Sequence, residues 1–165
     1  MHAQRWAREC AVTSARLSAE GTLMRKVLLA AMALLFLAGC GAAPPVALAD
    51  TTQLPRFLDG AAPRVRDAYR FAVANPDMLA HIPCYCGCGN MGHTSNLSCY
   101  VQSTAGDGTI AYDEHANGCG ICVDITQDVM RMSAAGQPLW EIRSYVDAQY
   151  SPFGPSTDTP LPPQP

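Results

Sequence analysis

The cysteine content constrains this chain more than any other feature, because eight cysteines in 165 residues require disulfides, a metal site or thiol chemistry. Residues 83–88 read Pro-Cys-Tyr-Cys-Gly-Cys, with three thiols at alternate positions. Two cysteines separated by one residue are poor disulfide partners, because the ring that they close departs from preferred disulfide geometry. The same spacing suits one ion, or a small polymetallic core, held by adjacent thiolates. The segment therefore predicts a metal or redox site, with structural disulfides as the alternative.

A second cysteine pair lies further along the chain, where Cys119 and Cys122 form a Cys-x-x-Cys motif. We expect both in the first turns of a helix, whose free N–H groups and positive partial charge favour thiolate. The motif alone fits a metal site or disulfide exchange equally well. Beside the first cluster it favours metal, and a local disulfide at the start of the helix is the alternative.

Two histidines accompany these cysteines, since His93 lies between Cys88 and Cys99 and His115 lies shortly before Cys119. Thiolates with imidazoles suit Cu(I), Zn(II) or an iron–sulfur centre and disfavour Mg²⁺ and Ca²⁺. A structural zinc site needs only four cysteines, so the six that follow Cys40 are more than such a site would use. We predict bound copper, with zinc as the alternative, and no catalytic residue. The predicted ligands are Cys84, Cys86, Cys88, Cys99, Cys119, Cys122, His115 and His93.

The region before these motifs has the pattern of an export signal. Residues 25–26 are basic, residues 27–37 are almost entirely apolar, and residues 37–40 read Leu-Ala-Gly-Cys. That tetrapeptide resembles the lipobox of bacterial lipoproteins, which implies acylation of Cys40. We expect translation to begin at Met24 and the protein to be anchored by lipid on the extracytoplasmic face of the cell membrane. An uncleaved membrane anchor is the alternative.

Composition and periodicity predict the organisation of the chain. We expect an over-extended start and signal peptide over 1–39, a lipidated flexible tether over 40–58, and a helical domain over 59–150. A disordered proline-rich tail is expected over 151–165.

Apolar residues at helical spacing place one helix at 62–74, a second from about Asn117 to Gly136, and a third from Pro138 to Tyr150. A weak β-hairpin is expected within 99–112. The predicted fold is mainly α: a small three-helix domain with a cysteine-rich irregular loop over 82–98.

Several function classes find no support in the sequence. The net charge is −3 and no basic stripe is present, so a nucleic-acid partner is not expected. A phosphate-binding glycine loop with lysine and a serine nucleophile motif are also missing from the sequence. These observations favour a binding protein over an enzyme.

The hexapeptide at 83–88 resembles the bacterial lipoproteins known as the PCYCGC-motif family, over about residues 60–153. The later Cys119-Gly-Ile-Cys122 and Glu141-Ile-Arg143 segments follow in the same order. The resemblance implies soft-metal binding and little else about function. Residues 119–154 are also similar to the three-helix thiol-bearing subunit of cytochrome c biogenesis. The chain lacks the Leu-Arg-Cys segment typical of that subunit, so this likeness implies architecture alone.

The sequence thus predicts a membrane-anchored lipoprotein that handles a soft metal ion and exchanges it with a metal-transfer or redox protein. One alternative is a thiol–disulfide oxidoreductase that uses Cys119 and Cys122. Another alternative is a structural module stabilised by disulfides. The metal hypothesis requires that the loop with Cys84, Cys86 and Cys88 meets the Cys119/Cys122 turn in the folded chain.

Overall fold

A computed structural model describes residues 46–163, so the predicted signal peptide and Cys40 lie outside the described residues. The described segment belongs to one compact unit. Among its helices, none has the length and apolar character needed to span a membrane. Its longer helices are α2 (Pro63–Ala74), α5 (Gly120–Ala134) and α6 (Leu139–Tyr150), and its shorter ones are α3 (Pro76–Leu79) and α4 (His115–Gly118). The mainly α fold predicted from the sequence is confirmed.

Helix α2 lies against α5 and supplies much of the core. It begins at Pro63, whose fixed φ and missing N–H suit the first helical position. Ala68, Tyr69, Phe71 and Ala72 of this helix are buried. The helix ends at Ala74, as predicted.

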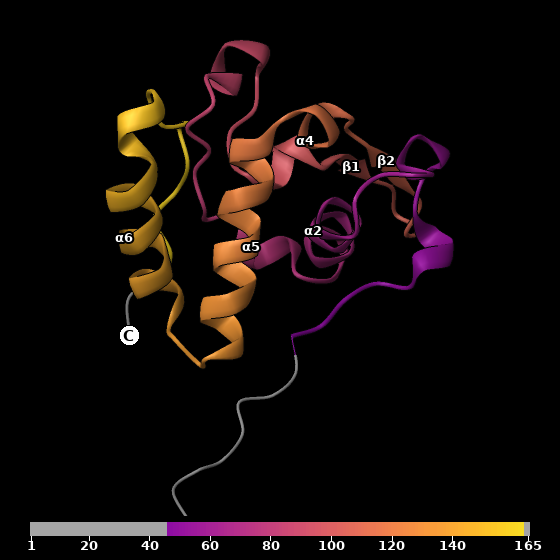
Figure 1. The fold of residues 1–165 in the computed structure, drawn as a ribbon, viewed down its shortest axis with the longest axis horizontal. Coiled ribbons are helices and arrows are strands. Elements are labelled where there is room, and N and C mark those ends of the chain that lie inside the picture. Colours follow the sequence, from indigo (N-terminus) through magenta and orange to yellow (C-terminus); the bar gives the residue numbers. More distant parts are fainter. Residues whose placement is uncertain (1–45, 164–165) are drawn as a thin grey trace, which may run out of the picture. The chain divides into compact units, whose positions relative to one another are not determined.

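Helices α5 and α6 run antiparallel, joined by a short link (Figure 1). Gly136 follows α5 with φ of 74°, a left-handed conformation that ends the helix. The predicted start near Asn117 is wrong, because Asn117 lies inside the separate short helix α4. The chain turns extended at Cys119, with φ of −117° and ψ of 101°, so Cys119 is the N-cap of α5.

The predicted hairpin is present as strands β1 (Val101–Thr104) and β2 (Ile110–Tyr112), which pair antiparallel with an irregularity between Val101 and Ser103. The irregular loop before it contains the 3₁₀ turns Cys88–Met91 and Leu97–Cys99. The hairpin is short and mostly exposed, so it contributes little to the core.

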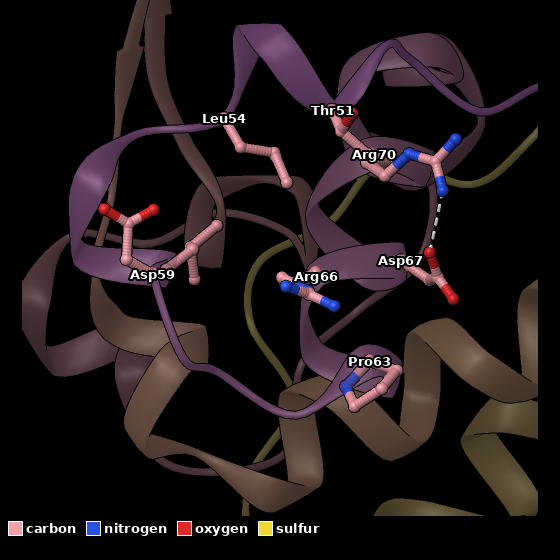
Figure 2. Close-up of a pocket in the computed structure, with 8 residues that line it drawn as sticks. Thr51, Leu54, Asp59, Pro63, Arg66, Asp67 and Arg70 are labelled. Atoms are coloured by element: carbon pink, nitrogen blue, oxygen red, sulfur yellow. Dashed lines mark hydrogen bonds and ion pairs between the residues drawn. The ribbon is translucent and has the colours of Figure 1, made fainter.

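The segment before α2, where we expected a flexible tether to 58, lies on the domain from its first described residue. The Ala49 N–H donates to the Arg70 carbonyl at 3.1 Å, and Leu58 is buried. Figure 2 shows the hollow between this segment and α2, where Arg70 contacts Asp67. The hollow carries charges of both signs, and no cysteine lines it.

The proline-rich tail also differs from the expected disorder, since residues 151–163 run back along the domain. It begins with the 3₁₀ turn Ser151–Phe153, and Thr157 is buried. Proline prevents a helix here, but the extended backbone is still free to form hydrogen bonds with another segment. At Thr157 it does so with the cysteine motif.

Candidate metal centre

The Pro-Cys-Tyr-Cys-Gly-Cys segment is held by hydrogen bonds to distant parts of the chain. The Cys84 N–H donates to Thr157 Oγ1, and the Thr157 N–H donates to the Cys84 carbonyl, both at 2.9 Å. The Tyr85 hydroxyl donates to Asp147 of α6 at 2.6 Å. These contacts direct the Tyr85 side chain toward α6, while the sulfurs of Cys84 and Cys86 meet at 3.4 Å.

A tight turn at the end of the motif brings in two more buried thiols. Gly87 has φ of 84°, a conformation that side chains disfavour. Cys88 begins the next 3₁₀ turn and Cys99 ends the one after it. The Sγ atoms of Cys88 and Cys99 lie 3.8 Å apart, and Cys99 Sγ lies 3.6 Å from Nδ1 of His93.

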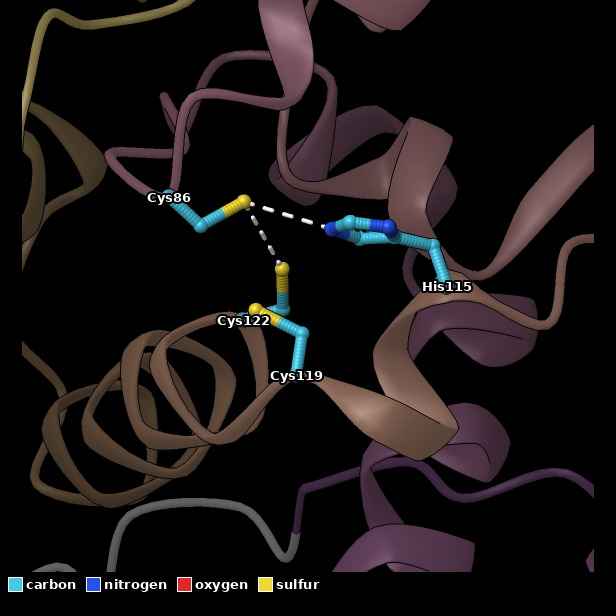
Figure 3. Close-up of side chains that lie close together, drawn as sticks. All are labelled: Cys86, His115, Cys119 and Cys122. Carbon is cyan, nitrogen blue, oxygen red and sulfur yellow. Dashed lines mark hydrogen bonds between the residues drawn. The ribbon is translucent and has the colours of Figure 1, made fainter.

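The other side of the site comes from α4 and the start of α5, as Figure 3 shows. His115 begins α4, Cys119 caps α5, and Cys122 lies in the first turn of α5. Nε2 of His115 lies 3.3 Å from Cys86 Sγ. The Cys122 sulfur lies 3.6 Å from that of Cys86.

The two cysteine-bearing regions therefore meet, as the metal hypothesis requires. Cys122 Sγ lies 3.3 Å from Cys84 Sγ and 3.3 Å from Cys99 Sγ. Two groups of four donors have all their ligand atoms within 4.8 Å of one another. They are Cys86, His115, Cys119 and Cys122, and Cys88, His93, Cys99 and His115.

The sulfur separations fit a shared metal ion better than disulfides. All six cysteines of the described segment are free thiols. A disulfide needs sulfurs about 2.05 Å apart, well below the separations seen here. Two thiolates on one tetrahedral ion, each about 2.3 Å from it, lie about 3.8 Å apart. The cluster thus has the donor types and the spacing that a soft ion requires.

Hydrogen bonds among the thiols shift their pKa values in opposite directions. The thiols of Cys122 and Cys99 hold the pKa of Cys84 far below its usual value. The Cys99 thiol is also the main cause that lowers the pKa of Cys86 to about 4. The Cys122 thiol lowers the pKa of Cys119 to about 7. As donors, Cys99 and Cys122 have raised pKa values.

Six charged sulfurs this close together would repel one another, so the fully deprotonated cluster requires a cation. Burial opposes the charged form of His115, but its hydrogen bond with Cys86 and the negative charge of Cys86 and Cys119 raise its pKa. A bound cation would replace the shared protons of the cluster.

Polar side chains around the cluster fix its backbone. The Cys122 carbonyl accepts from the Tyr100 hydroxyl at 2.9 Å and from Nδ2 of Asn96 at 3.3 Å. The Thr126 hydroxyl in turn donates to Asn96 at 2.7 Å. All three side chains are fully buried, so they restrain the first turn of α5 where Cys122 lies.

Asp113 links the two histidines. Its Oδ1 accepts from the His115 backbone N–H at 2.8 Å, and its Oδ2 lies 3.6 Å from Nε2 of His93. An imidazole that ligates through one nitrogen commonly has its other nitrogen paired with a carboxylate. His93 has that arrangement, with Nδ1 toward Cys99 and Nε2 toward Asp113.

The structure brings together every cysteine and both histidines that the sequence predicted as ligands. His81 is separate, with Nδ1 against the Pro160 carbonyl, and Met91 is exposed. Sequence reasoning missed Thr157, Asn96 and Tyr100, because isolated polar residues give no signal of what they contact.

Comparisons with known proteins identify a family that shares the cysteine motif. A family model described as "Protein of unknown function with PCYCGC motif" matches residues 46–162. The match extends on both sides of the range 60–153 that the motifs indicated, and it includes the two segments that lie against the domain. No match was found among curated proteins or among solved structures.

Proposed function

The chain belongs to the family of proteins of unknown function with a PCYCGC motif, and we propose that it binds a soft metal ion through its cysteine cluster. The observation that carries the proposal is the convergence of six free thiols and two imidazoles in one cluster. They come from the loop 84–99, from α4 and from the start of α5. Convergence from separate segments favours a shared ligand over a local role for each motif.

Copper(I) is the preferred ion and zinc the alternative. Thiolate-rich sites with imidazole suit both, and hard ions such as Mg²⁺ require oxygen ligands. No aspartate or glutamate belongs to the clustered donor groups of residues 46–163. The excess of thiols over the four that a structural zinc site needs supports copper.

We further propose that the protein works on the extracytoplasmic face of the cell membrane, held by lipid on Cys40. The lipobox-like segment at 37–40 supports this location. A role in metal handling or trafficking then follows, with a second protein that delivers or receives the ion. Half-buried donors such as Cys86 and Cys119 would give such a partner access.

The test is anaerobic metal loading of the full chain, with Cys10→Ser and Cys40→Ser so that six thiols remain. We expect stoichiometric Cu(I) uptake by elemental analysis, loss of free thiols on loading, and a weaker response to Zn(II). His81→Gln, a histidine change outside the cluster, is the matched control and retains full uptake. Recovery of metal-free protein with three fixed disulfides contradicts the proposal.

One observation favours a second function, thiol–disulfide exchange. Cys119 is half-buried at the start of a helix, and its pKa is lowered to about 7. Under this alternative the metal-free chain reduces a test disulfide, and Cys119→Ser abolishes the activity. If the chain takes up metal but does not reduce the test disulfide, thiol–disulfide exchange is excluded and metal binding remains the function.

A further inference from the structure

The donors in the cluster outnumber those that one ion can use. A tetrahedral ion takes four ligands, and six sulfurs and two imidazoles lie together here. The groups of four share a single member, His115. Each group of four could hold its own ion, but the His115 nitrogen can bind only one of the two ions.

Cys84 can take the place of His115 beside Cys88 and Cys99. Its sulfur lies within 4.8 Å of those of Cys88 and Cys99. It also lies 3.4 Å from Cys86 Sγ and 3.3 Å from Cys122 Sγ, both in the other group. The fully buried Cys84 sulfur therefore lies beside both sets of donors and is available to the inner one.

The two sets of donors differ in exposure. In the outer set, Cys86, His115 and Cys119 are half-buried, and only Cys122 is fully buried. In the inner set, Cys84 and Cys99 have no exposed surface and Cys88 has 2%. His93, the remaining inner donor, exposes 10% of its side chain.

We propose that the cluster holds two soft ions, an inner ion that is retained and an outer ion that is exchanged. This inference rests on the proposed metal function and gives the two ions different roles within it. Metal transfer proceeds by attack of an incoming donor on the bound ion, so it needs access to the ion. The outer donors give an incoming thiolate or thioether that access, and the buried inner sulfurs deny it.

The experiment loads the full chain, with Cys10→Ser and Cys40→Ser, with Cu(I) under anaerobic conditions and then adds a chromogenic Cu(I) chelator. We expect two bound ions, counted by native mass spectrometry, and release in a fast and a slow phase of equal amplitude. Cys119→Ser removes the fast phase and one ion. His93→Gln removes the slow phase, and Cys88→Ser gives a second test of the inner position.

Met91→Leu serves as the control, because it changes an exposed sulfur outside the donor groups and should retain both phases. A single bound ion, or two ions that leave in one phase, overturns this inference while the metal function stands. Failure to bind any Cu(I) overturns both. Circular dichroism of each variant separates ligand loss from loss of the fold.

Discussion

The loop that carries Cys84, Cys86 and Cys88 and the turn that carries Cys119 and Cys122 are held in place in different ways. The loop depends on partners far away in the sequence, since Thr157 lies 73 residues from Cys84. The turn is part of a helix, so backbone hydrogen bonds within α5 position its thiols, with Asn96 and Tyr100 as additional support. One half of the candidate centre is therefore set by tertiary contacts and the other by local structure.

The largest effect should come from Thr157→Val, which keeps the volume but removes the hydroxyl that accepts from the Cys84 N–H. A buried N–H without a partner costs about 1–3 kcal/mol. Loss of such a support around a metal site lowers affinity by about 10–100-fold. Denaturant unfolding and Cu(I) competition measure the two effects.

Ser156→Ala is the matched control, because Ser156 is the exposed neighbour of Thr157. It should change neither stability nor affinity. If Thr157→Val behaves like Ser156→Ala, the tail does not support the loop and the contrast between the two halves fails.

A smaller effect is expected from Gly87→Ala in the same loop. Gly87 has φ of 84° with no atom within 4 Å of an added Cβ, so the cost is backbone strain alone. A left-handed residue with a side chain costs about 1–2 kcal/mol. The free energy of unfolding should fall by that amount, with weaker Cu(I) binding.

Gly89→Ala provides the comparison, because its φ is not positive and its added Cβ would lie 3.9 Å from Thr157 Cγ2, an ordinary contact. This variant should stay close to the parent protein. Equal losses of stability from both variants would show that the turn at Gly87 has no special requirement.

The smallest effect should come from Tyr100→Phe, on the helical side. The change removes one donor to the Cys122 carbonyl, which still accepts from Asn96. We expect a loss of about 1 kcal/mol in unfolding free energy and unchanged Cu(I) affinity, because α5 itself holds Cys122.

Tyr112→Phe, which removes a surface hydrogen bond to the Gln53 carbonyl, should cost less and serves as its control. A large loss of affinity in Tyr100→Phe would mean that the helical half also depends on distant contacts.

The same contrast explains what the sequence could predict. Apolar residues at helical spacing predicted α2, α5 and α6, and the cysteine spacing predicted both parts of the cluster. These signals are local, and so is the turn that gives Cys122 its position. The break at Cys119 was missed because α4 and α5 follow each other closely enough to share one periodic pattern.

Contacts between distant segments were beyond prediction. A threonine in a proline-rich tail has no pattern that reveals its hydrogen bond with Cys84. Asp113 likewise pairs with the His93 ring and with the His115 backbone. Single polar residues acquire such roles only in the folded chain.

The Tyr85 side chain and the two flanking cysteine side chains point in opposite directions. The order of residues in this motif therefore matters more than its composition. Tyr85 is tied to Asp147 on one side, and Cys84 and Cys86 meet on the other. Inserting one residue after Tyr85 would shift every later thiol by one position and turn Cys86 toward α6. The segment should therefore tolerate a change of the Tyr85 side chain more readily than a change of its length.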